Sequence, residues 1–161
     1  MKKSMLFGIL FLSVMFLFSC GKNTLKMGTT TFPDDECGFN FENEEIIQLP
    51  GGGWRDYPDL VNQMDLGWSD KYIGAVPTIE GQSLLTGLLM DMGSVSFESV
   101  KEAPIFGFEH AEWISFQINH VYCLNTRTNK YAKIVLTKGD FNMDSLTIKW
   151  KYQTNGSRVL E

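Results

Sequence analysis

The chain has 161 residues, of which 14 are Lys or Arg and 19 are Asp or Glu, and its formal net charge is −5. This length suits a single domain with a buried core. The acidic balance argues against a nucleic-acid-binding protein, because phosphate backbones are bound by clusters of Lys and Arg. It argues equally against electrostatic docking on anionic lipid.

The first twenty residues follow the pattern of a secretory signal peptide. Lys2 and Lys3 precede an uncharged, mostly apolar run from Ser4 to Gly21. A positive start, an apolar centre and a small-residue exit are typical of such peptides. The run is also nearly long enough to cross a bilayer, which takes ~20 apolar residues, so a retained transmembrane anchor is the alternative.

The end of this run, Leu17-Phe18-Ser19-Cys20-Gly21, resembles the lipobox of bacterial lipoproteins. The resemblance implies a signal peptide over residues 1–19, cleavage before Cys20, and a Cys20 thiol that carries fatty chains such as palmitate. Two acyl chains suffice for stable membrane anchoring. Gly21 in place of an Asp favours the outer membrane over the inner one where a cell envelope has both. The alternative is a signal-peptide cysteine without a role.

Residues 22–43 are polar and show no hydrophobic periodicity. Such a segment buries too little apolar surface to offset the entropy of ordering it. We therefore predict that residues 20–43 are the lipidated cysteine and a disordered tether. Residues 44–161 are predicted to form a β-rich domain.

The middle of the chain contains several short strand candidates. Glu45–Leu49 is β-prone, and Met64–Trp68 alternates with the period of a strand. Ile73–Ile79 contains Pro77 and is therefore at most an edge strand. The leucines of Ser83–Met92 have helical spacing, but the nearby glycines disfavour a helix and favour a buried strand.

The last third of the chain predicts three strands at His120–Asn125, Tyr131–Thr137 and Ser145–Gln153. In the polar turn between the first two, Asn129 can adopt a positive φ at little cost. Antiparallel strands joined in this way form a meander with one solvated face. We predict an all-β antiparallel fold, in the form of a β-sandwich. On the last strand, one face is apolar and consists of Leu146, Ile148, Trp150 and Tyr152. The other face consists of Thr147, Lys149 and Lys151, which are expected to point to water.

Four segments at this end, Val121–Thr126, Lys130–Ile134, Ile148–Gln153 and Asn155–Ser157, resemble the C-terminal part of HmuY-type bacterial lipoproteins. The resemblance covers residues 121–161. It implies an all-β, lipid-anchored protein, and some members of this family capture haem through two axial side chains.

Haem iron accepts His, Met, Cys or Tyr as axial ligands. The haem-ligand candidates in this chain are His110, His120, Met90 and Met92, and the two methionines would lie on one face of a strand. The alternative is that the methionines fill the core, since Met next to Leu usually packs there. The histidines would then be ordinary loop or strand-end residues.

Two further cysteines, Cys37 and Cys123, leave a disulfide or two thiols as alternatives, because export permits a bridge. No Cys or His spacing predicts a metal site. Gly81-Gln82-Ser83-Leu84 lacks the closing glycine of a nucleophile elbow, and no catalytic constellation is visible. We expect a non-enzymatic, lipid-anchored envelope protein whose domain binds a small molecule or an envelope protein. A haem-scavenging lipoprotein and a structural envelope component are the alternatives.

Overall fold

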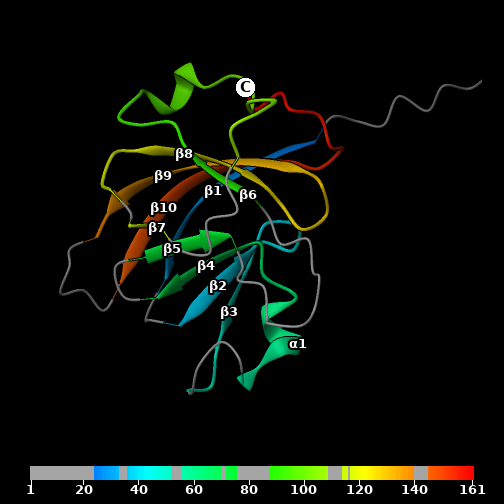
Figure 1. Ribbon diagram of the computed structural model, residues 1–161, viewed down its shortest axis with the longest axis vertical. Helices are drawn as coiled ribbons and strands as arrows, with labels where there is room; N and C mark the ends of the chain where they lie inside the picture. Colours follow the sequence, from blue (N-terminus) through cyan, green and yellow to red (C-terminus); the bar gives the residue numbers. More distant parts are fainter. Residues whose placement is uncertain are drawn as a thin grey trace, which may run out of the picture.

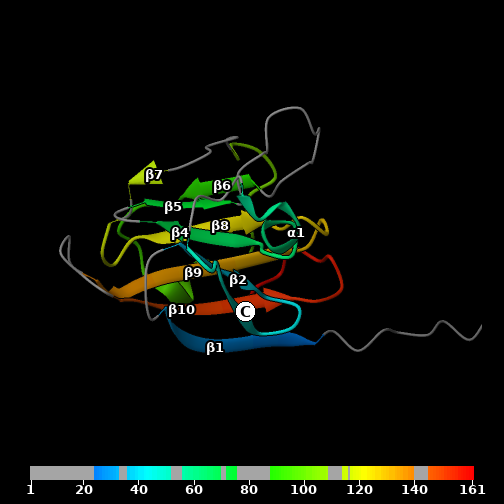
Figure 2. The same ribbon diagram turned by 90° about the horizontal axis from the view of Figure 1, so that it is seen from below.

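The computed structural model describes residues 24–32, 36–51, 56–69, 72–75, 88–108, 114–115, 117–139 and 145–161. These residues form two five-stranded antiparallel sheets that face each other (Figures 1 and 2). The predicted all-β, antiparallel sandwich is thus confirmed. Within the described ranges, no helix combines the length and the apolar character needed to span a bilayer.

The first sheet has its strands in the order β1, β10, β9, β8, β6. Their bounds are β1 (Leu25–Phe32), β6 (Leu88–Asp91), β8 (Val121–Asn125), β9 (Tyr131–Lys138) and β10 (Leu146–Gln153). The predicted meander corresponds to β8, β9 and β10, and Asn129 in its first turn has the expected positive φ of 55°.

The second sheet has its strands in the order β3, β2, β4, β5, β7. Their bounds are β2 (Cys37–Asn40), β3 (Glu45–Gln48), β4 (Leu66–Ser69), β5 (Tyr72–Ala75) and β7 (Ile114–Ser115). The edge position predicted for β5 is wrong, because β5 pairs with β4 on one side and with β7 on the other. The four-residue helix α1 (Pro58–Val61) precedes β4.

The predicted tether over residues 20–43 is wrong for its larger part. Leu25–Phe32 is an edge strand that pairs with β10 over eight residues, and Cys37–Asn40 is a central strand of the second sheet. The polar threonines fit because β-branched residues suit a pleated edge, and Thr30 Oγ1 accepts a hydrogen bond from Trp150 Nε1 at 2.9 Å. Gly28 is needed opposite Trp150, since a Cβ there would lie 2.8 Å from the indole. Residues 20–23 lie outside the described ranges.

The core between the sheets is rich in aromatic rings. Trp150 of β10 lies 5.5 Å from Phe39 and 5.7 Å from Phe41, measured between ring centroids, and Phe41 stacks on Tyr152 at 5.8 Å. The apolar face predicted for the last strand is confirmed, because all four of its residues are buried there. Edge-to-face and stacked pairs of this kind add to the free energy of area burial.

Candidate functional site

The outer face of the first sheet is covered by residues 92–108, which we call the covering segment. It contains a short 3-10 helix, η2 (Phe97–Ser99). Phe97 and Val100 are buried against Val121, Cys123 and Val135 of the sheet. Figure 1 shows this segment and the C-terminus above the sheet, on the side away from the second sheet. The middle of the meander is therefore buried on both faces, and the solvated face predicted for it is wrong there, whereas outer positions of β1 such as Met27 stay exposed.

Lys133 is the central residue of the contact between the covering segment and the sheet. Its side chain is 0% exposed, and its Nζ donates hydrogen bonds to Phe97 O at 2.8 Å and to Val100 O at 2.6 Å. Desolvation lowers the pKa of Lys133. A buried amine is costly unless it is hydrogen-bonded, so these two carbonyl oxygens are what make its burial tolerable.

Two lysines of the neighbouring strand β10 also take part in this contact. Glu98 accepts hydrogen bonds from Lys149 Nζ at 2.9 Å and from Lys151 Nζ at 3.0 Å, and these bonds lower the pKa of Glu98 to about 2. The Nζ atoms of Lys133 and Lys149 each lie 4.6 Å from the centroid of the Phe97 ring, a cation–π distance. The expectation that Lys151 points to water is wrong, because Lys151 is buried, whereas Lys149 stays 45% exposed while it pairs with Glu98.

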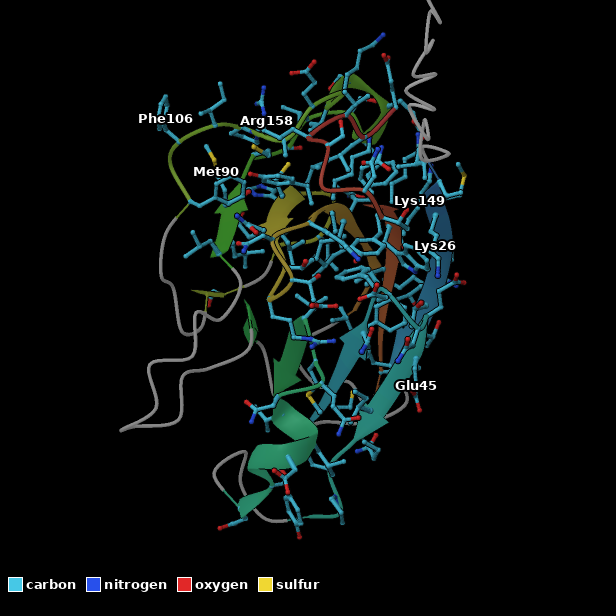
Figure 3. The ribbon with its side chains drawn as sticks, turned by 90° about the vertical axis from the view of Figure 1, so that its right-hand side faces the viewer. Lys26, Glu45, Met90, Phe106, Lys149 and Arg158 are labelled. Atoms are coloured by element: carbon cyan, nitrogen blue, oxygen red, sulfur yellow. The ribbon has the colours of Figure 1, made fainter. Side chains whose placement is uncertain are left out.

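An exposed apolar tip lies beyond this contact. Ile105 is 64% exposed and Phe106 is 83% exposed, which are the largest exposed fractions among the large hydrophobic residues that the structure describes. Gly107 has a φ of +91°, and the centroid of the next ring, Phe108, lies 6.2 Å from that of Tyr131. Figure 3 shows Phe106 projecting at the upper left of the molecule, above Met90.

The base of this tip is tied to the C-terminal tail. Ala103 N donates to Arg158 O at 2.8 Å, and Arg158 Nη1 donates to Ala103 O at 2.7 Å. Leu160 N donates to Lys101 O at 2.7 Å, and Leu160 itself is buried. The exposed apolar side chains thus stand on a fixed platform, so their exposure is a property of the folded chain.

The structure does not bring the haem-ligand candidates together. Met90 faces Gly107 and shares the outer face with Cys123, its partner across the strands, and Met92 packs beside Phe97 and Val100. Met90 lies in β6, but Met92 follows the end of that strand, so the two methionines do not share a face of one strand as predicted. His120 lies instead beside Asp91 and Tyr122, whose ring belongs to the inner core. His120 is therefore not placed opposite Met90 or Met92 in a way that would let the pair hold haem iron from two sides. His110 lies outside the described residues.

His120 and Asp91 form a polar pair at the end of β6. His120 Nδ1 lies 3.1 Å from Asp91 Oδ1 and 3.0 Å from Oδ2, and Gly93 N donates to Oδ1 at 2.7 Å. The carboxylate orients the imidazole ring through Nδ1. In the part of the chain that the structure describes, no group of three His, Cys, Asp or Glu residues has the geometry of a metal site.

The disulfide that the sequence left as one alternative is not formed. Cys37 and Cys123 are both buried thiols. The reason is their placement, because Cys37 belongs to the core between the sheets, whereas Cys123 belongs to the cluster under the covering segment. Burial raises the pKa of Cys123 to about 11, which keeps the thiolate, the reactive form, scarce at neutral pH.

A second buried charge lies at the opposite side of the core. Asp65 is 2% exposed; its Oδ2 accepts from Phe41 N at 3.1 Å, and its Oδ1 lies 3.4 Å from Arg127 Nε. Burial raises the pKa of Asp65. The contacts join the turn after β2 to the turn after β8, which is a structural role.

Sequence reasoning did not single out Lys133, Glu98 or Phe106. A signal for the first was present, since Ile134-Val135-Leu136 is a continuous apolar run, and such runs are typical of strands buried on both faces. A strand covered on both sides must bury Lys133 as well. Glu98 and Phe106 carry no comparable signal, because their roles depend on where the covering segment lies.

Comparisons with known proteins add no family to this description. No protein-family model matches the chain, and no curated protein is significantly similar to it.

Proposed function

We propose that this chain is a lipid-anchored protein of the bacterial cell envelope whose β-sandwich is a non-enzymatic binding module. The observation that carries the proposal is the lipobox-like Leu17–Gly21 at the end of an apolar run, with a folded domain following directly. A thiol at that position is the acceptor for acyl chains, each of which adds ~0.8 kcal/mol of membrane affinity per buried CH₂.

The described residues support a binding role over a catalytic one. Two of their buried ionisable groups are engaged by structural partners: Lys133 by two carbonyl oxygens, and Asp65 by Phe41 N and Arg127. A catalytic side chain must be accessible to a substrate and must have a second group nearby that assists it. The apolar tip at Ile105 and Phe106, by contrast, is presented to solvent from a fixed base. Exposed aromatic and aliphatic side chains on a rigid base are suited to binding.

The anchor is tested by expressing the full chain in bacteria that are fed an alkyne analogue of palmitate. We expect the analogue on the protein, and an N-terminal peptide that begins with acylated Cys20 in the mass spectrum. Cys20→Ala should lose both the label and the cleavage. Cys37→Ala is the matched control and should keep them. An unlabelled wild-type chain with residues 1–19 still attached would contradict the proposal.

A further inference from the structure

We propose that the outer side of the first sheet, with Ile105 and Phe106 at its tip, lies against the lipid bilayer that holds the anchor. This inference rests on the proposed function, since it needs an acylated Cys20. In this arrangement the apolar tip contacts the headgroups and the upper part of the acyl chains.

The length of the chain between the anchor and the fold limits where the membrane can be. The described fold starts at Thr24, four residues after Cys20, and β1 begins at Leu25. Four extended residues reach at most ~14 Å. A domain on so short a connection cannot stand away from the bilayer, so one of its surfaces must lie at the lipid.

Two sets of hydrogen bonds, both made by the C-terminal tail, link the start of the fold to the base of the apolar tip. Thr154 N and Oγ1 both donate to Thr24 O, at 3.4 and 3.0 Å. Four residues further, Arg158 is bonded to Ala103, two residues before Ile105. Figure 3 shows Arg158 and Phe106 at the upper end of the molecule, with Phe106 at the left and the start of β1 at the right. The start of the fold and the tip therefore lie on two sides of the same upper end.

The exposed apolar side chains are distributed in the way a lipid contact requires. Of the six large hydrophobic residues that are exposed in the described ranges, four belong to the start of β1, the tip or the C-terminal tail: Met27, Ile105, Phe106 and Val159. Met27 is on the outer side of β1, because its cross-strand partner is Lys151. Apolar groups exposed singly need no explanation, but Phe and Ile together at a tip above a fixed base suit insertion into a bilayer interface.

The charged side chains of this surface are paired with one another and leave no positive excess. The ion pairs are Lys101 with Glu161, Lys149 and Lys151 with Glu98, and Arg158 with Glu102. Lys133 is 0% exposed beneath the covering segment and adds no charge to the outside. The contact with lipid is therefore assigned to the apolar tip and not to charge.

The test uses the full lipidated chain reconstituted into vesicles of phosphatidylcholine and phosphatidylglycerol. An environment-sensitive fluorophore is attached to Phe106→Cys, and in a matched control to Asp59→Cys on α1, an exposed position. Cys37 and Cys123 are 0% exposed, so the dye reacts with the introduced thiol. Nitroxide-bearing lipids then quench a fluorophore that lies within the bilayer interface.

We expect the lipid nitroxides to quench the fluorophore at residue 106 at least twofold more than the one at residue 59. Equal quenching at both positions, with Cys20 shown to be acylated, would overturn this inference and leave the anchor intact. Shielding of residue 106 from aqueous iodide without quenching by lipid would indicate contact with a second copy and would also overturn it. If the dye labels the wild-type chain at Cys20, the thiol is bare, and it is the proposed function that fails.

Discussion

The two faces of the first sheet are buried by different physical means. The inner row Tyr122, Ile134 and Trp150, paired across three strands, packs against rings of the second sheet. One residue further along each strand, the outer row Cys123, Lys133 and Lys151 lies under the covering segment. Neighbouring residues on the same strands thus belong to an apolar core and to a contact held partly by amines.

This difference teaches that the two layers have separable stabilities. The inner face is stabilised by area burial and ring contacts, which depend on the whole sandwich. The outer face depends on a few hydrogen bonds from lysine amines to one segment, and a segment held in this way can open without global unfolding. The tip that we assign to the membrane has its own attachment, because backbone hydrogen bonds fix its base to the C-terminal tail.

Replacing Trp150 should give the largest effect, because it breaks the inner face at its centre. Trp150→Ala removes contacts with Phe39 and Phe41 and leaves a cavity, and such changes cost about 3–5 kcal/mol. Urea unfolding followed by circular dichroism measures the loss. A loss below about 1 kcal/mol, which is typical of surface positions, would contradict the central role of this ring.

Replacing Lys133 should have a smaller global effect and a large local one. Lys133→Met leaves the carbonyl oxygens of Phe97 and Val100 without their donor, at a cost of about 1–3 kcal/mol. Relief of the desolvated charge offsets part of it. Opening of the covering segment should make Cys123 react faster with a thiol reagent, while Cys37, in the inner core, keeps its rate.

The matched control for Lys133 is Lys138→Met, at an exposed lysine of the same strand β9. We expect little change in either thiol. If Cys37 and Cys123 both reacted faster with the thiol reagent, and to the same extent, in the Lys133 variant, the two layers would open together. Their stabilities would then not be separable.

Acid should loosen the outer layer through Glu98. Its pKa is lowered from 4.5 to about 2 by hydrogen bonds from Lys149 and Lys151. Because the folded-state pKa is depressed, this stabilisation is fully present above about pH 4.5 and is lost as the pH falls through about 2. Hydrogen-exchange protection of residues 97–100 should therefore decline between these values.

Glu98→Gln removes the titrating group. The variant should show weaker protection of residues 97–100 at pH 5 and little further decline on acidification. Asp59→Asn, on α1, is the control and should follow the wild type. Identical pH profiles for the wild type and the Gln variant would exclude Glu98 as the acid-sensitive group.

The smallest effect is expected for the methionines on the outer face. Met90→Leu and Met92→Leu conserve volume and should cost less than about 1.5 kcal/mol. If haemin produces a Soret shift with the wild-type chain, both variants should reproduce it, because Met90 faces Gly107 of the covering segment and Met92 packs against the cluster beneath that segment. A shift that disappears in either variant would show that a methionine is an iron ligand.

The sequence predicts the inner face well and the outer face poorly, for one physical reason. Alternation along β10 identifies Leu146, Ile148, Trp150 and Tyr152 as core, because burial of one face leaves a period of two in the same strand. The burial of Lys151 depends on residues 92–108, which are distant in sequence and have no period of their own.

The first strand was missed for a related reason. Leu25–Phe32 is polar and contains three successive threonines, so composition predicts disorder. Its order comes from β10, which supplies the backbone pairing and the indole N–H for Thr30. The haem-ligand candidates likewise could not be placed from residue types, since a one-residue offset puts His120 and the methionines on opposite faces.

The most direct test of where the membrane lies is hydrogen exchange on the lipidated chain, measured by mass spectrometry in vesicles and in detergent-free solution after enzymatic removal of the acyl chains. We expect residues 101–108 and 24–29 to become more protected on vesicles, and residues 56–69 around α1 to keep their exchange rates. Protection confined to residues 56–69, or no difference at 101–108, would contradict a bilayer on the outer side of the first sheet.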